Sequence, residues 1–263
     1  DSSTSRGLGD VYKRQVLSHM GHHLYTLPTA LVSNTLDYGK FYIQETTEYM
    51  RQSLKVWAEL GFSFDVVSTG MILSAEQAAL VSDFCEQSAK KGALVFVDPI
   101  MGDEGKLYNG VGEETIAHMR KMVAVADCIV PNYTEAAYLA DMPYHEDMTE
   151  EEARALTIRL HAMGAKSVVV TSAKVDGENC VVGYDGTEGE FFRIPFDLIP
   201  VRFVGTGDIF AAVMLGRLVD GVPLQESTHR AMDAVRTMID RNRDKEDKYL
   251  GIPIETCLEV LDE

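Results

Sequence analysis

The chain of 263 residues is short of basic side chains, because 24 Lys and Arg stand against 41 Asp and Glu. The resulting net charge of −17 repels the phosphate backbone of nucleic acids, which excludes DNA and RNA as main partners. An anionic ligand must therefore be held locally, by a metal ion, a helix N-terminus or oriented backbone N–H groups.

Cysteine is also scarce, and long apolar runs are absent from the sequence. The four cysteines are Cys85, Cys128, Cys180 and Cys257. They form no C-x-x-C pair, and three of them lie in apolar runs typical of a core. No stretch approaches the roughly 18 consecutive apolar residues of a membrane span, and the N-terminus lacks an apolar signal region. We therefore expect a cytoplasmic protein with no membrane partner.

The composition is that of an ordinary globular protein, with 46% hydrophobic and 25% charged residues. These values exclude a disordered, collagen-like or disulfide-stapled chain. Residues 1–15 are polar and aperiodic, so we expect them to form a non-native or disordered leader. No repeat or low-complexity linker divides residues 16–263, which predicts one domain over that range.

Short apolar runs alternate with helical patterns along this domain. Strands are predicted at residues 24–32, 64–68, 93–98, 128–131 and 167–171, with a hairpin over 179–184 and 191–196. Capping boxes at 74–77 and 149–152 predict helix starts, and Gly164 and Gly221 predict helix ends. The alternation indicates an α/β fold whose mostly parallel sheet is covered by helices on both faces and has an antiparallel edge.

The most informative motif is Gly205-Thr206-Gly207-Asp208, which directly precedes an apolar helical run. Backbone N–H groups in such a turn, aligned with the positive end of a helix dipole, form a cradle for a phosphate or a transferring phosphoryl group. An Asp in the first turn can accept a proton from a substrate hydroxyl. On its own, the motif is explained as well by a tight turn with Asp208 as a capping residue.

Polar side chains also follow three of the predicted strands, where ligands collect in open α/β sheets. Asp98 and Asp103 follow one strand, and Asn132 and Glu135 follow the next. Their oxygens suit Mg²⁺, bound directly or through water, although Asp98 before a proline and Glu135 in a first helical turn also have ordinary structural explanations. Thr171 and Ser172 end a Val-rich strand, where hydroxyls are either phosphate contacts or turn formers.

Together these segments resemble the ribokinase superfamily, and most closely its bacterial pyridoxal/pyridoxamine kinase branch. The resemblance runs from about residue 16 to the C-terminus. It rests on the ordered motifs at 98–103 with 105–108, at 131–135 and at 205–208, supported by 33–34 with 38–40 and by 74–77.

The resemblance implies a ribokinase-like three-layer α/β/α fold and an ATP-dependent kinase that phosphorylates the 5′-hydroxymethyl group of a B6 vitamer. Asp208 is then the general base, and the N–H groups of Gly205, Thr206 and Gly207 form the anion hole. The implied nucleotide and phosphate contacts are Asp98, Asp103, Tyr108, Asn132, Glu135, Thr171 and Ser172, with Glu135 and Asp98 also organising Mg²⁺. The implied substrate contacts are Ser33, Thr35, Tyr38 and Met71. A homodimer and a monovalent cation are further implications.

The sequence departs from this family at three places. Residues 1–15 stand where members have a first strand and a Gly-containing substrate loop, so we expect the first strand to be missing. Thr35-Leu36 replaces a His-Thr pair, and Met71 replaces a Tyr. These changes leave two alternatives open: a hydroxymethylpyrimidine kinase or other small-alcohol kinase of the superfamily, and a catalytically impaired nucleotide-binding protein.

Overall fold

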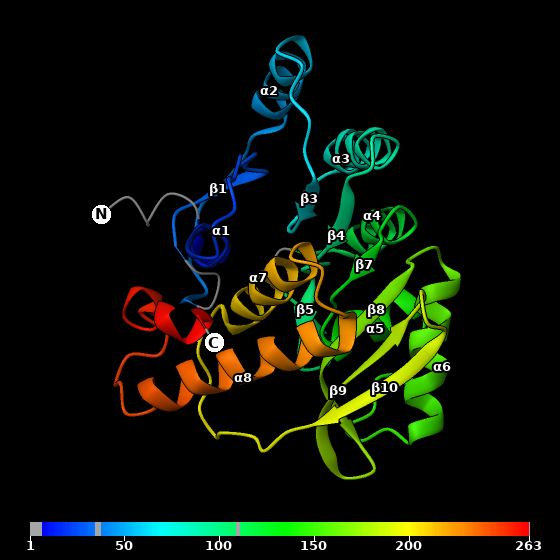
Figure 1. Cartoon of the computed structure of the whole chain (residues 1–263), viewed down its shortest axis with the longest axis vertical. Helices are drawn as coiled ribbons and strands as arrows, with labels where there is room; N and C mark the ends of the chain where they lie inside the picture. The colour runs from blue at the N-terminus through cyan, green and yellow to red at the C-terminus, as the bar shows by residue number, and fades with distance from the viewer. Residues whose placement is uncertain (1–6, 35–37, 109–110, 263) are drawn as a thin grey trace. The chain divides into compact units, whose positions relative to one another are not determined.

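The computed structural model describes residues 7–34, 38–108 and 111–262, which form two compact units (Figure 1). The central unit comprises residues 47–197. The terminal unit combines residues 1–46 with residues 198–263, so it is built from both ends of the chain. Each unit is described by itself below.

A six-stranded sheet organises the central unit, in the order β10-β9-β8-β7-β4-β3. Its strands are β3 (Val66–Thr69), β4 (Leu94–Val97), β7 (Cys128–Ile129), β8 (Ser167–Val175), β9 (Glu178–Asp185) and β10 (Glu190–Pro195). β3, β4, β7 and β8 pair in parallel, whereas β8, β9 and β10 pair antiparallel. The predicted parallel sheet with an antiparallel edge is therefore confirmed. β3 lies at the other edge, and among the described residues β4 is its only strand partner.

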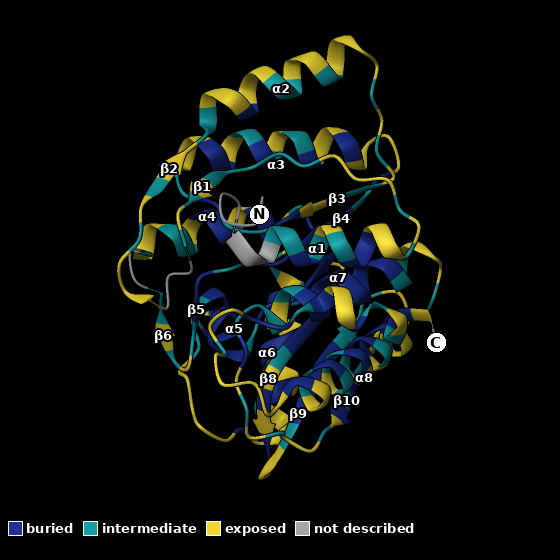
Figure 2. Ribbon diagram, turned by 90° about the vertical axis from the view of Figure 1, so that its left-hand side faces the viewer, coloured by how far each residue is buried: buried dark blue, intermediate teal, exposed yellow. Residues whose placement is uncertain are grey.

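The buried strands explain why the sheet forms where it does. Val95, Phe96 and Val97 of β4 are fully buried, as are the three consecutive valines 168–170 of β8. Continuous apolar runs of this kind are typical of strands covered on both faces. The dark blue strands at the centre of Figure 2 show this core.

The described part of the central unit contains five helices, of which α2 packs on α3 and the other four lie nearer the sheet (Figure 1). They are α2 (Thr47–Glu59), α3 (Ala75–Ala89), α4 (Glu113–Val123), α5 (Tyr133–Ala140) and α6 (Glu150–Ala162). Thr149 and Glu152 form the predicted capping box of α6. Ser74 caps α3 as predicted by accepting from the N–H of Gln77, and the Gln77 side chain accepts from the N–H of Leu73. A small hairpin of β5 (Gly102–Asp103) and β6 (Lys106–Leu107) lies between β4 and α4.

The terminal unit contains α1 (Gly7–His19), the antiparallel pair β1 (Ala30–Val32) and β2 (Ile43–Glu45), α7 (Thr206–Val219) and α8 (Leu224–Asn242). Two 3₁₀ turns, Ile254–Thr256 and Leu258–Asp262, follow near the C-terminus. Residues 209–216 of α7 are all buried, as an apolar helical run predicts. The strand expected over 24–32 was too long, since only Ala30–Val32 pairs.

Residues 7–15, which lie in the expected non-native or disordered leader, form part of α1. The side chain of Tyr12 is only 2% exposed, and its hydroxyl donates to the carbonyl oxygen of Ile252 at 2.9 Å. Val16 and Leu17 are buried as well. The sequence pattern failed here because these few apolar residues are buried by the C-terminal segments of the chain, which a local pattern does not reveal. Residues 1–6 lie outside the described range.

No helix in the described ranges is long and apolar enough to cross a membrane. All four cysteines are buried free thiols, which agrees with the core positions expected for them.

Tyr12→Phe tests whether α1 is an integral part of the terminal unit. Removing the hydroxyl leaves the buried carbonyl of Ile252 without this donor, which costs about 1–2 kcal/mol of unfolding free energy. We expect Tm to fall by about 2–4 °C for each 1 kcal/mol lost, measured by calorimetry. Tyr42→Phe, at a tyrosine that is 67% exposed, is the control and should leave Tm unchanged. Equal Tm values for Tyr12→Phe and the parent chain would contradict the integration of α1.

Candidate active site

The residues singled out by the sequence fall into two groups, one in each unit. Those of the central unit are Met71, Asp98, Asp103, Tyr108, Asn132, Glu135, Thr171 and Ser172. Those of the terminal unit are Ser33, Tyr38, Gly205, Thr206, Gly207 and Asp208. Thr35 lies outside the described residues.

In the central unit, several of these residues lie just after the carboxyl ends of parallel strands, and so at the same end of the sheet. Met71 follows β3, Asp98 directly follows β4, and Asn132 follows β7. The N–H of Asp98 donates to the carbonyl of Thr69 at 3.3 Å, and Asn132 forms a parallel bridge with Thr171 of β8. Open α/β sheets bind ligands at this end, where the parallel strands finish.

The carboxylate of Glu135 is the centre of a buried network at this end of the sheet. Its Oε1 accepts from the backbone N–H of Met101 at 2.9 Å and of Gly102 at 3.5 Å, while its Oε2 accepts from the N–H of Asn132 at 2.9 Å. The Asn132 side chain completes a capping box by accepting from the N–H of Glu135 at 2.9 Å. Its amide also donates to the carbonyl of Gly102 at 2.7 Å. Glu135 therefore ties the segment after β4 to the start of α5.

The environment of Glu135 works against its negative charge. Burial raises the pKa of this carboxyl well above 4.5, and the nearby charge of Asp98 raises the pKa further. The backbone N–H groups of Met101, Asn132 and Gly102 oppose this rise. Asp98 is itself buried, so two carboxyl groups lie close together in a region with little solvent. A cation beside Asp98 would relieve this repulsion.

The β5–β6 hairpin is clamped onto the N-terminal half of α5. Its turn residues Glu104 and Gly105 both have positive φ, 51° and 79°. The N–H of Gly105 donates to Thr134 Oγ1 at 2.8 Å, and a Cβ on Gly102 would lie 2.3 Å from the carbonyl oxygen of Lys106. The predicted contacts Asp103 and Tyr108 thus lie on or beside a fixed hairpin. Thr134, which anchors it, escaped the sequence analysis, since a buried threonine in a helix carries no distinctive pattern.

Thr171 and Ser172 do not end their strand as expected, because β8 continues to Val175. The pairing of β8 with β9 shifts register between Val170 and Ala173, and Ser172 has a φ of 56°. A β-bulge therefore turns these two residues away from the regular ladder. Ser172 is exposed and Thr171 half-buried, so both hydroxyl-bearing residues remain reachable from solvent.

In the terminal unit, the Gly205-Thr206-Gly207-Asp208 motif opens α7 as predicted. Gly205 is the N-cap with φ 84°, a conformation that favours glycine, and Asp208 is the third helical residue. Helix geometry leaves the first N–H groups of α7 without carbonyl partners inside the helix. Gly207 is exposed, and a Cβ placed on it would meet no atom within 4 Å. The N-terminus of α7 is therefore accessible to solvent at Gly207.

Asp208 forms an ion pair with Lys13 of α1, with 3.3 Å between Nζ and Oδ1. Each of the two side chains is 19% exposed. The Oδ1 atom is buried and accepts no hydrogen bond that meets geometric criteria. Lys13 was not among the expected site residues, because it belongs to the segment that the sequence marked as a leader.

The predicted ring contacts of the terminal unit lie in the connection between β1 and β2. Ser33 donates its hydroxyl to Asn34 Oδ1 at 2.6 Å and accepts from the N–H of Tyr42 at 2.9 Å. Tyr38 is largely exposed and packs against Tyr249, with 5.5 Å between ring centroids. The Ser33 hydroxyl therefore supports the local turn, whereas the Tyr38 ring remains accessible.

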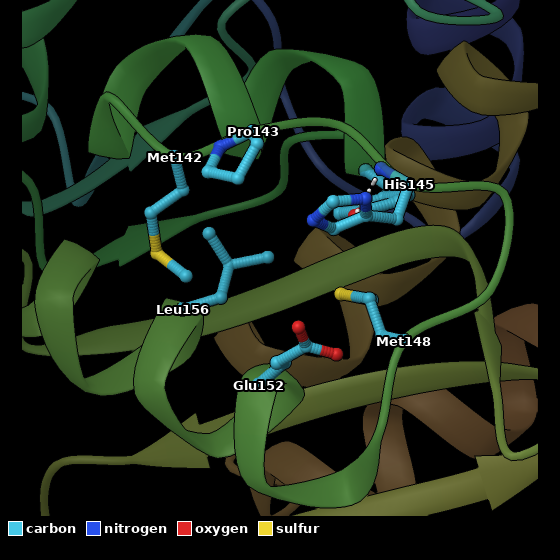
Figure 3. Close-up of a pocket in the computed structure, with 7 residues that line it drawn as sticks. Met142, Pro143, His145, Met148, Glu152 and Leu156 are labelled. Atoms are coloured by element: carbon cyan, nitrogen blue, oxygen red, sulfur yellow. Dashed lines mark hydrogen bonds between the residues drawn. The ribbon is translucent and has the colours of Figure 1, made fainter.

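A small cavity lies between α5, α6 and their connecting loop (Figure 3). Its volume is about 30 Å³, and its lining residues are Tyr133, Met142, Pro143, His145, Met148, Glu152 and Leu156. This volume holds about one water molecule, far less than a nucleotide needs. None of the predicted site residues lines it.

The donor set for a metal ion is small. Across residues 7–34, 38–108 and 111–262, no group of three or more His, Cys, Asp and Glu side chains is placed to hold a metal ion. Glu135 and Asn132 already use their side-chain oxygens for backbone N–H groups. Asp98 and Glu135 are the two acidic side chains here that could serve Mg²⁺, directly or through their charge.

Glu135→Gln tests the network around this carboxyl. A carboxyl offers two acceptor oxygens, whereas an amide places an NH₂ group against one of the buried backbone N–H donors. We expect a loss of about 1–3 kcal/mol in the free energy of unfolding, measured by urea denaturation. Glu113→Gln, at an exposed acid in the first turn of α4, is the control and should cost about 0.5 kcal/mol. A loss at Glu135 no larger than that of the control would show that the network is not structural.

Comparison with known proteins agrees with this geometry. The sequence profile of the phosphomethylpyrimidine kinase family matches residues 15–251. Pyridoxal kinase of Arabidopsis thaliana is 33% identical over 171 residues, covering 62% of this chain and 53% of the plant protein. The chain spans about half the length of the curated relatives it matches.

Several solved structures resemble this chain over nearly its whole length. A Bacteroides thetaiotaomicron protein assigned as a phosphomethylpyrimidine kinase, crystallised with pyridoxal, has a TM-score of 0.91 and 32% identity, with coverage of 96% of this chain and 90% of that one. Pyridoxal kinase from Lactobacillus plantarum has a TM-score of 0.86 and 28% identity, with coverage of 99% and 94%. With a family match that includes the residues at the carboxyl ends of the strands and the opening of α7, the chain belongs to the phosphomethylpyrimidine kinase family, of ribokinase-like fold.

Proposed function

We propose that this protein transfers the γ-phosphoryl group of ATP to the 5′-hydroxymethyl group of a B6 vitamer. The observation that carries the proposal is the glycine-opened N-terminus of α7 with Asp208 in its first turn. The family match and the pyridoxal kinase relatives support the same reaction class.

In the proposed mechanism, Asp208 accepts the proton of the substrate hydroxyl as its oxygen attacks phosphorus. The N–H groups of Gly205, Thr206 and Gly207 donate to the equatorial oxygens of the transferring group. Phosphoryl transfer depends chiefly on positioning and charge neutralisation, so this small set of groups is chemically adequate.

Magnesium is the proposed metal cofactor, and Asp98 is the residue that would hold it. Glu135 and Asn132 would keep the loop after β4 in place, and Glu135 would add negative charge. When bound, Mg²⁺ neutralises charge on the nucleotide phosphates. Thr171 and Ser172 at the β8 bulge, with Asp103 and Tyr108 of the hairpin region, are proposed contacts of the nucleotide.

Ring recognition is proposed to come from Ser33, Thr35, Tyr38 and Met71. The family match also favours a second substrate class, hydroxymethylpyrimidine, whose ring carries a comparable primary alcohol. An ADP-release assay with pyridoxal, pyridoxamine, pyridoxine and hydroxymethylpyrimidine separates the two. Turnover highest with a B6 vitamer supports the first proposal, and turnover confined to the pyrimidine replaces it with the second.

A homodimer and a monovalent cation stay predictions of the family resemblance, and a cytoplasmic location stays a prediction from the sequence composition.

Asp208→Asn tests the general base. The change removes proton acceptance but keeps the size of the side chain, so turnover should fall about 10²–10⁴-fold while ADP affinity stays nearly unchanged. Turnover is measured by ADP release and affinity by calorimetry. Asp220→Asn, at the exposed C-terminal end of the same helix, is the matched control and should keep parental turnover. Near-parental turnover of Asp208→Asn would reject the assigned base.

Asp98→Asn tests the proposed metal ligand. Loss of this charge should raise the Mg²⁺ concentration for half-maximal turnover roughly tenfold, as read from a magnesium titration. The control is Asp141→Asn, because Asp141 is an exposed left-handed cap of α5 and asparagine tolerates that conformation. A titration curve that coincides with that of the parent would remove Asp98 from the metal site.

A further inference from the structure

Gly105, in the turn of the β5–β6 hairpin, is approached from three directions by α5 and the loop that follows it. Its N–H donates to Thr134 Oγ1 at 2.8 Å, and its carbonyl oxygen accepts from the Tyr138 hydroxyl at 3.4 Å. A Cβ on Gly105 would lie 3.1 Å from the ring of Tyr144. Thr134 and Tyr138 belong to α5, whereas Tyr144 lies in the loop after it. The turn is therefore held by two hydrogen bonds from α5 and by one aromatic ring from the loop.

Tyr133 holds the ring of Tyr144 in place. The two rings stack with 4.8 Å between their centroids and 27° between their planes. Tyr133 is only 4% exposed, and its hydroxyl accepts from the backbone N–H of His145 at 3.0 Å. The residue that follows Tyr144 is thus tied to the same buried tyrosine. Stacked aromatic pairs of this kind stabilise a structure beyond the area they bury.

Acidic groups of the hairpin lie near the Tyr144 hydroxyl. Burial raises the pKa of Tyr144, and the charges of Asp103, Glu146 and Glu104 raise the pKa further. The phenol therefore stays neutral at neutral pH and adds no charge beside Asp103. The contribution of Tyr144 to the hairpin is one of packing.

We propose that Tyr144 is a positioning residue for the nucleotide, because its ring fixes the hairpin turn that lies between Asp103 and Tyr108. The inference rests on the proposed function, in which Asp103 and Tyr108 contact the nucleotide. Tyr144 acts through Gly105, against which its ring packs. Without the ring the turn keeps its hydrogen bonds to α5 but has more freedom, so that nucleotide binding must order it at an entropic cost.

Tyr144→Ala is the direct test, since it removes the ring. The Kd for ADP, measured by calorimetry well below the Tm of each variant, should rise about fivefold, the factor that one stacked ring is worth. The KM for ATP should rise by a similar factor, whereas kcat should stay within twofold of the parent. Tyr144→Phe keeps the ring, so its Kd should stay within twofold of the parent. Tyr49→Ala, at a tyrosine of α2 that is 56% exposed, is the matched control and should keep the parental Kd.

Gly105→Ala disturbs the same contact from the side of the hairpin. The added Cβ meets the Tyr144 ring, and a φ of 79° disfavours alanine. The Kd for ADP should rise here as well. Gly92→Ala is the control for backbone strain, because Gly92 has a φ of 96° but a Cβ there would meet no atom within 4 Å. Its Kd should equal that of the parent.

A double-mutant cycle tests whether the two residues act through one contact. In Gly105→Ala combined with Tyr144→Ala, the new methyl group no longer meets a ring. The rise in Kd should therefore be smaller than the product of the two single rises. A rise equal to that product would overturn the contact and the positioning role.

Hydrogen exchange tests the hairpin without nucleotide. The N–H of Gly105, which donates to Thr134, should exchange about fivefold faster in Tyr144→Ala than in the parent, as followed by NMR. An unchanged exchange rate would overturn the proposal.

The outcomes also separate this inference from the proposed function. An unchanged Kd for ADP in Tyr144→Ala, with ADP bound by the parent, would overturn the positioning role and leave the proposed kinase standing. A parent that neither binds ADP nor turns over any B6 vitamer or hydroxymethylpyrimidine would overturn the proposed function and the positioning role together.

Discussion

The buried carboxyl of Glu135 is the constraint on which the central half of the site depends. Three backbone N–H groups converge on its two oxygens, so the loop after β4 and the first turn of α5 are held as one piece. This tie adds to the hydrogen bond from Asp98 to Thr69 and to the one from Gly105 to Thr134 in holding Asp98 and the β5–β6 hairpin. The same burial that makes the tie strong also makes its charge costly, which is why a cation near Asp98 suits this site.

Because the chain is so acidic, an anionic substrate has to be bound by local groups. With a net charge of −17, the surface as a whole does not attract phosphates, and only local groups can. The first turn of α7 supplies backbone N–H groups for this purpose. Lys13 supplies a cation at the same helix end, but the ammonium is engaged with Asp208. In the proposed reaction these backbone N–H groups receive the phosphoryl group, and Asp208 is the base.

Much of the fold was predictable from the sequence, because its signals are local. The valine runs of β4 and β8, the capping box at Thr149 and the glycine that opens α7 all act within a few residues. The helix over residues 7–19 was not predictable, since its buried side chains are covered by segments about 200 or more positions away. In the site, the sequence indicated Asp98, Glu135 and Asp208, whereas the roles of Lys13 and Thr134 depend on contacts with residues that are not their neighbours in the sequence. The network of Glu135 likewise became evident only when its backbone donors were placed.

The hydroxyl of Tyr12 links two positions that lie 240 residues apart, and this has a consequence for biosynthesis. Residues 47–197 are contiguous, so this stretch can fold while the ribosome is still adding the remainder. The segments that surround Tyr12 can meet only after nearly the whole chain has been translated. The N-terminal end of α7 is thus among the last features to form, and a nascent or truncated chain would carry a finished β-sheet but an incomplete terminal unit.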